Sequence, residues 1–159
     1  MKSLRVLSAL VLCLSLSAAF AADVTGKWVG KVQIDESKIP AAKNAQQTEL
    51  RKKMLKAIKG TTFNLDLKAN KSWTMVASLI GIDKDGKPKT QQHKVDGSWK
   101  MDGKNVVMKT LHEDGNPSKN DQGEVLEPAN GGKALKMLPP KRGNGPGMLS
   151  SILFTRAKG

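Results

Sequence analysis

The chain of 159 residues carries 27 Lys and Arg side chains against 14 Asp and Glu, and its net charge of +13 predicts association with anions. Its only cysteine, Cys13, lies in a segment that we expect to be removed, which excludes a disulfide, a thiol nucleophile and a thiolate metal site from the mature chain. The length is sufficient for one domain, not two.

Residues 1–21 have the pattern of a cleaved secretory signal. Two basic residues precede an apolar stretch, and Ala19-Phe20-Ala21 supplies the small residues that a signal peptidase accepts. The stretch is too short to span a membrane, and nothing later reaches the roughly 20 apolar residues that a span needs. We therefore expect a secreted, periplasmic protein whose residues 22–159 form one domain. Export argues against nucleic acid as a partner.

Eight short segments alternate apolar and polar residues between turn signals, which is the pattern of an antiparallel all-β domain. These segments cover residues 26–34, 61–69, 72–80, 90–101, 104–112, 123–128, 133–138 and 148–156.

One helix is expected between the first two of these strands, at residues 41–59. Pro40 stands near its first turn and Gly60 follows its end, the usual positions of these residues at helix termini. A narrow apolar stripe runs along a strongly basic helix; the stripe is Leu50, Met54, Leu55 and Ile58, and the basic residues are Arg51, Lys52, Lys53, Lys56 and Lys59. We interpret it as a surface helix that covers part of a sheet; a lid that touches a membrane is the alternative.

The alternation of each strand assigns its side chains to faces. On the first strand, Trp28 shares a face with Val32 and Ile34. Asp102-Gly103 predicts a two-residue hairpin turn, which would place Trp99 opposite Val106, Gly97 opposite Met108, Val95 opposite Thr110 and His93 opposite His112. If the strands run up and down in sequence, the three tryptophans and Arg156 lie at one end. The helix and the long loops then lie at the other end.

Two short motifs carry a family resemblance: "TGKW" on the first strand and "FTR" near the end of the last strand resemble the calycin superfamily, the lipocalins and the intracellular fatty-acid-binding proteins. The resemblance implies an eight-stranded up-and-down antiparallel barrel with one helix between strands 1 and 2. In this barrel Trp28 would plug the closed end, Gly26 would allow the tight approach to it, and Arg156 would pack across the indole ring. Trp73 and Trp99 would complete the closed end.

The chain also departs from both branches of that superfamily. It has no tyrosine and no predicted arginine inside the barrel, which fatty-acid-binding proteins use to hold carboxylates, and it lacks the disulfide and the final helix of most lipocalins. Small secreted bacterial lipocalin-like domains are the nearest match in outline.

The resemblance further implies a ligand cavity at the open end of the barrel, mostly apolar with a few polar groups. Its predicted lining is Val32, Ile34, Phe63, Leu79, Gln91, His93, Thr110 and His112. A basic rim around it would comprise Lys52, Lys56, Lys84, Lys87, Lys141 and Arg142, which suits an anionic amphiphile. The alternative is a barrel filled by its own side chains, as small eight-stranded barrels often are.

Catalytic and metal-binding patterns are weak. His93 opposite His112 could begin a zinc or copper site, but two histidines are too few for one, and Asp83-Lys84-Asp85-Gly86-Lys87 lacks the acidic residue that closes a calcium loop. Nucleophile elbows, paired inward carboxylates and phosphate-binding glycine loops are missing. We expect no enzyme, no cofactor and no metal.

The sequence therefore predicts a monomeric secreted barrel that binds a small apolar or anionic amphipathic molecule. The alternative is a non-enzymatic structural or interaction module whose basic face binds an anionic envelope polymer or an acidic protein.

Overall fold

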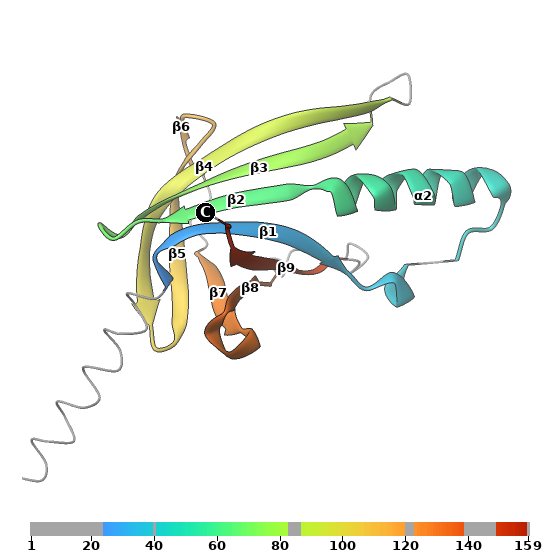
Figure 1. Ribbon diagram of the computed structural model, residues 1–159. Helices are drawn as coiled ribbons and strands as arrows, with labels where there is room; N and C mark the ends of the chain where they lie inside the picture. The colour runs from blue at the N-terminus through green and yellow to red at the C-terminus, as the bar shows by residue number, and fades with distance from the viewer. Residues whose placement is uncertain (1–23, 40, 83–86, 120–122, 139–148, 159) are drawn as a thin grey trace, which may run out of the picture.

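The computed structural model describes residues 24–39, 41–82, 87–119, 123–138 and 149–158, and its described part is built mainly of antiparallel strands (Figure 1). Chain order is β1 (Gly26–Ile34), the short helix η1 (Glu36–Lys38), α2 (Ala45–Gly60), β2 (Thr62–Leu67), β3 (Ser72–Ile82), β4 (Pro88–Asp102), β5 (Asn105–Glu113), β6 (Asn116–Pro117), β7 (Glu124–Ala129), the short helix η2 (Asn130–Gly132), β8 (Ala134–Met137) and β9 (Leu149–Arg156).

Eight strands of this part of the chain close a barrel. Each pairs antiparallel with its neighbour in the ring order β1, β2, β3, β4, β5, β7, β8, β9, and β9 returns to β1. The two-residue strand β6 extends the sheet only beside β5. The predicted fold class is confirmed: an eight-stranded up-and-down antiparallel barrel with one helix between the first two strands. This architecture is compatible with a calycin-like fold.

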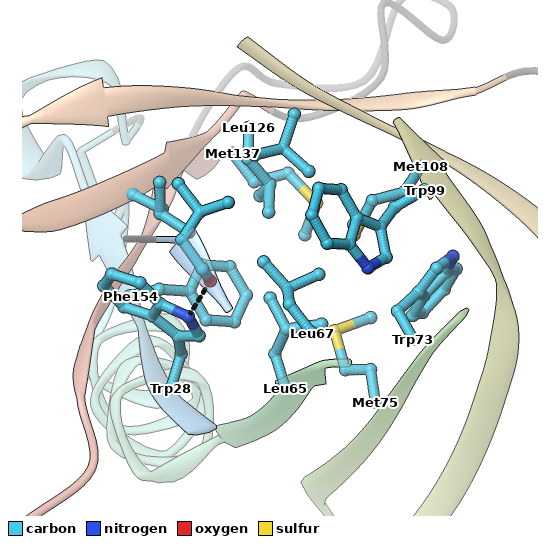
Figure 2. Packing of buried hydrophobic residues seen from close by; sticks show 13 residues of the cluster. Trp28, Leu65, Leu67, Trp73, Met75, Trp99, Met108, Leu126, Met137 and Phe154 are labelled. Carbon is cyan, nitrogen blue, oxygen red and sulfur yellow. Dashed lines mark hydrogen bonds between the residues drawn. The ribbon is translucent and has the colours of Figure 1, made fainter. Parts of the chain in front are cut away.

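The interior of the barrel is filled with apolar side chains from every part of the ring (Figure 2). Alternation places one side chain in two on this inner face. The largest that are shielded almost completely from solvent are Trp28, Trp73, Phe154, Leu65, Leu67, Met108, Leu126, Leu135 and Val106. Gly30 makes room for this packing, because a Cβ there would lie 2.6 Å from Cε1 of Phe154.

The β4–β5 hairpin differs from its predicted register. The chain turns at Gly103 and Lys104, where Gly103 has a φ of +58°, so Asp102 lies opposite Asn105. The shift by two residues keeps the predicted faces but places Trp99 opposite Met108, not opposite Val106.

A bulge between Asp96 and Gly97 shifts the register of this hairpin once more. It forms at a glycine because a Cβ on Gly97 would overlap the backbone carbonyl oxygen of Lys109. The shifted turn and the bulge together make three predicted pairs wrong, those of Gly97 with Met108, Val95 with Thr110 and His93 with His112. Gly97 lies opposite Thr110, Val95 opposite Glu113, and Asp96 opposite His112.

Helix α2 lies in line with β2, between β1 and β3, so that it continues the barrel wall where β2 has not yet begun (Figure 1). It begins at Ala45, later than the predicted residue 41, because the side chain of Asn44 accepts a hydrogen bond of 2.8 Å from the backbone N–H of Gln47 and so caps the helix. At its other end, a Cβ on Gly60 would lie 2.5 Å from Cδ1 of Ile80, so glycine allows close contact with β3. No helix in the described part of the chain has the length and apolar character that crossing a membrane requires.

Candidate functional site

The closed end of the barrel is built around Trp28. Its indole N–H donates a 3.0 Å hydrogen bond to the carbonyl oxygen of Val24, drawn as the dashed line in Figure 2. The guanidinium carbon of Arg156 lies 4.2 Å from the centre of the same ring, and Arg156 also donates to the carbonyl oxygen of Thr25. Gly26, with a φ of +117°, leaves room for this guanidinium, since a Cβ there would lie 2.9 Å from its Nη1.

The other two tryptophans close the neighbouring side of the same end. The indole N–H of Trp73 donates to the carbonyl oxygens of Ser98 (3.0 Å) and Lys109 (3.2 Å), and that of Trp99 donates to Lys68 (3.1 Å). The ammonium group of Lys71 lies 3.9 Å from the centre of the Trp99 ring. These contacts make the closed end a structural plug, in which buried indole N–H groups are satisfied by backbone carbonyls.

The residues predicted to line the open end divide into two groups. Thr110 is buried opposite Gly97, and Val32, Ile34, Phe63 and Leu79 are half-buried. Phe63 forms an edge contact with Phe154, with ring centres 6.5 Å apart, so it completes the filled core. Gln91, His93 and His112 are exposed.

Each histidine has its own aspartate partner in place of the other histidine. Nδ1 of His93 lies 2.9 Å from Oδ2 of Asp114, and Nδ1 of His112 lies 2.8 Å from Oδ2 of Asp96. Asp114 also accepts the backbone N–H of Lys94 at 2.8 Å. This hydrogen bond, together with that of His93, lowers the pKa of Asp114 below its usual value of 3.8. In the described residues no three or more His, Cys, Asp or Glu side chains gather in a way that could hold a metal ion.

A groove of about 260 Å³ lies along α2, outside the ring of strands. The chain that approaches the helix forms one side with Ile39, Ala41 and Ala42, and the helix forms the other with Gln47, Leu50, Arg51, Met54, Leu55 and Ile58. Leu50 and Met54 keep 55% and 42% of their surface exposed, although both are large and apolar. The apolar stripe found in the sequence is therefore not covered by the sheet along its whole length.

Two exposed ion pairs involve basic side chains of α2. Nζ of Lys59, in the last turn of α2, lies 2.6 Å from Oε1 of Glu36 in η1, and this contact lowers the pKa of Glu36. Lys52 pairs within the helix with Glu49 at 2.9 Å and lowers the pKa of that carboxyl group. Both pairs are exposed, so each contributes little to stability.

The surface of α2 is strongly basic. The helix has five basic side chains and one acidic side chain, and Lys52 and Lys56 of the predicted basic rim are exposed on it. Lys87, which precedes β4, is exposed as well. Lys84, Lys141 and Arg142 lie outside the described residues. The helix thus combines an apolar groove with cationic side chains.

One inward residue escaped the sequence analysis. Glu124, the first residue of β7, lies opposite Met108 on the same face as buried Leu126, so its side chain is directed toward the barrel interior. Its Oε2 atom is shielded from solvent and has no hydrogen-bond partner. Burial raises the pKa of Glu124 above its usual value of 4.5, and the nearby carboxylate of Glu113 adds to the rise. The alternation of the predicted strand 123–128 already contained the signal that places this residue beside Leu126.

Comparison with known proteins gives no family: no protein-family model matches the chain, and no curated protein matches it significantly.

Proposed function

We propose that the chain is a secreted, periplasmic barrel that binds a small apolar or anionic amphipathic molecule, as the likeness to small lipocalin-like domains implies. The observation that carries this proposal is the groove along α2. Its lining is mainly apolar and includes one basic side chain, that of Arg51. Apolar pockets with a few polar groups are the usual sites of small ligands.

The size and position of the groove limit what would fit. At about 260 Å³ it is slightly smaller than the roughly 300–1,000 Å³ of typical ligand sites, so it suits a short molecule or the apolar tail of a longer one. The closed half of the barrel is occupied by Trp28, Phe154 and Met108, each almost completely buried. We therefore expect the apolar part of the ligand to lie between α2 and residues 39, 41 and 42, and the anionic part to lie toward Arg51.

Native mass spectrometry tests this proposal. Residues 22–159 would be purified from the exporting cell without denaturation, and any bound molecule would be extracted into organic solvent. We expect a stoichiometric bound mass of a few hundred daltons. A protein that remains bare after incubation with fatty acids, haem and divalent metals would contradict the proposal.

Variants on the helix locate the site. Replacing Leu50 and Met54 together with Gln should weaken ligand binding at least tenfold, because it makes the exposed part of the groove polar, while the melting temperature stays unchanged. The matched control is Leu111→Gln on β5, a leucine with 44% of its surface exposed but remote in sequence from the groove. Equal losses for both would indicate a general effect of surface polarity.

The second candidate is an interaction module, and the same helix supports it. Exposed apolar side chains among five basic ones are also the features of a surface that docks on an anionic envelope polymer or an acidic protein. Binding of such a partner should weaken steeply as salt is raised from about 0.05 to 0.5 M, because charges on exposed side chains are screened. Binding of an apolar ligand in the groove should change much less over this range.

A further inference from the structure

The junction between β5 and β7, which we call the seam, is the least extensively paired part of the closed ring. In the described residues it consists of Val106 opposite Leu126, Val107 opposite Val125 and Met108 opposite Glu124. Every other neighbouring pair in the ring has at least four register pairs. Beyond Met108, β5 leaves β7 and pairs with β6 through His112 and Glu113 (Figure 1). Within the described part of the chain, the last pair of the seam is therefore that of Met108 with Glu124.

A carboxyl group stands at this last pair in an environment that does not suit a charge. Oε2 of Glu124 is shielded from solvent without a hydrogen-bond partner, and its register neighbour Met108 is fully buried. A buried carboxylate that has no partner loses its hydration without compensation. A neutral carboxylic acid loses far less, so the closed seam favours the protonated side chain.

The charged groups around Glu124 do not relieve this cost. On β5, the exposed carboxylate of Glu113, which accepts a hydrogen bond from Ser118 at 2.7 Å, repels a second negative charge. His112 is directed to β4, where it pairs with Asp96. On β7 and β8, Glu127 and Lys136 are register partners on the outer face of the barrel. Among the described residues, no cation is found to act on Glu124.

We propose that Glu124 is a proton-sensitive latch of the seam: the protonated side chain keeps the last register pair closed, and the ionised side chain opens it. Glu124 as a whole is half-buried, and its shielded Oε2 atom would reach water if the Met108–Glu124 pair, the last described pair of the seam, separated. Opening would expose the inner face of the barrel at Met108 and Thr110. This inference is independent of the ligand proposed above.

Hydrogen exchange measured by mass spectrometry on the whole chain tests the latch. Protection of the amides in residues 105–110 and 124–129 would be followed between pH 4 and 7.5, corrected for the intrinsic pH dependence of exchange. The opening constant of the seam should rise by up to about tenfold per pH unit between the usual Glu pKa and the raised one, and then level off. Protection of β1 and β3 should not follow this profile.

Two variants and one direct measurement decide the outcome. Glu124→Gln keeps the shape of the side chain and should abolish the pH dependence of seam opening, whereas Glu127→Gln on the outer face of the same strand should retain it. A pH-independent seam in the unmodified protein, or the same profile in Glu124→Gln, would overturn the proposal. If Glu124→Gln does not fold, carbon NMR titration of the unmodified chain decides the matter. A titration midpoint of the Glu124 carboxyl carbon at or below pH 4.5 would contradict the latch. A Met108 amide whose chemical shift does not change around that midpoint would contradict it as well.

Discussion

Replacing Trp28 by Ala should remove the plug at the closed end of the barrel. The side chain is 1% exposed, so its removal leaves a large cavity among residues that cannot collapse into it. Truncation of a buried Trp typically costs about 3–5 kcal/mol in the free energy of unfolding. Two further contributions move the expected loss toward the upper end of that range. They are the hydrogen bond to the carbonyl of Val24, about 1 kcal/mol, and the contact with Arg156, about 0.5–1 kcal/mol.

Equilibrium unfolding in guanidinium chloride, followed by far-UV circular dichroism, measures this loss without depending on the fluorescence of the removed tryptophan. Trp28→Phe should lose less, because a ring still fills most of the space while the hydrogen bond to Val24 disappears. Lys27→Ala is the control, since Lys27 is exposed on the same strand. A loss below about 1 kcal/mol for Trp28→Ala would refute the assignment of this residue as the plug.

Three further predictions concern the β4–β5 hairpin and the seam. Gly97→Ala should lower the melting temperature more than Gly103→Ala, because a Cβ at Gly97 would overlap the carbonyl of Lys109. At Gly103 no atom lies within 4 Å of such a Cβ, and only the positive φ is unfavourable. Equal losses in melting temperature would contradict a bulge at Gly97. The pKa of Glu124 is raised in the folded chain, so its contribution to stability is present at low pH and is lost as pH rises above about 4.5. In thermal melts, the melting temperature of Glu124→Gln should therefore rise relative to that of the unmodified chain as pH increases. The pKa of Asp114 is lowered, so the effect of pH is opposite: its contribution to stability is present above pH 3.8 and is lost on acidification below that value. Asp114→Asn should remove this part of the acid dependence of the melting temperature.

Much of the barrel could be predicted from the sequence, because the face on which a side chain lies depends on the alternation of residues within a single strand. Alternation and strand order placed Trp28, Trp73 and Trp99 together at the closed end, and all three are buried there. A register error of an even number of residues leaves such faces unchanged, which is why the incorrect hairpin turn did not disturb the prediction of the core.

The polar part of the open end could not be predicted in the same way, because it depends on register across strands. The two-residue shift at the turn and one extra residue at the bulge beside Gly97 together separate His93 from His112, and each pairs with an aspartate. That bulge forms through a close backbone approach from Lys109, a contact that no local pattern reveals. The groove was missed for a related reason: the sequence showed the apolar stripe of α2, but the residues that face it, Ile39, Ala41 and Ala42, carry no periodic pattern.

The position of α2 in line with β2 has a consequence for association between chains. β1 is paired with β2 as far as Lys31, and β3 is paired with β2 as far as Ser78. Beyond these residues the helix lies beside both strands. If α2 swings away, for instance to admit a ligand, it uncovers the edge of β3 beyond Ser78, a short template for intermolecular β-pairing. The close contact of Gly60 with Ile80 holds the helix against this edge.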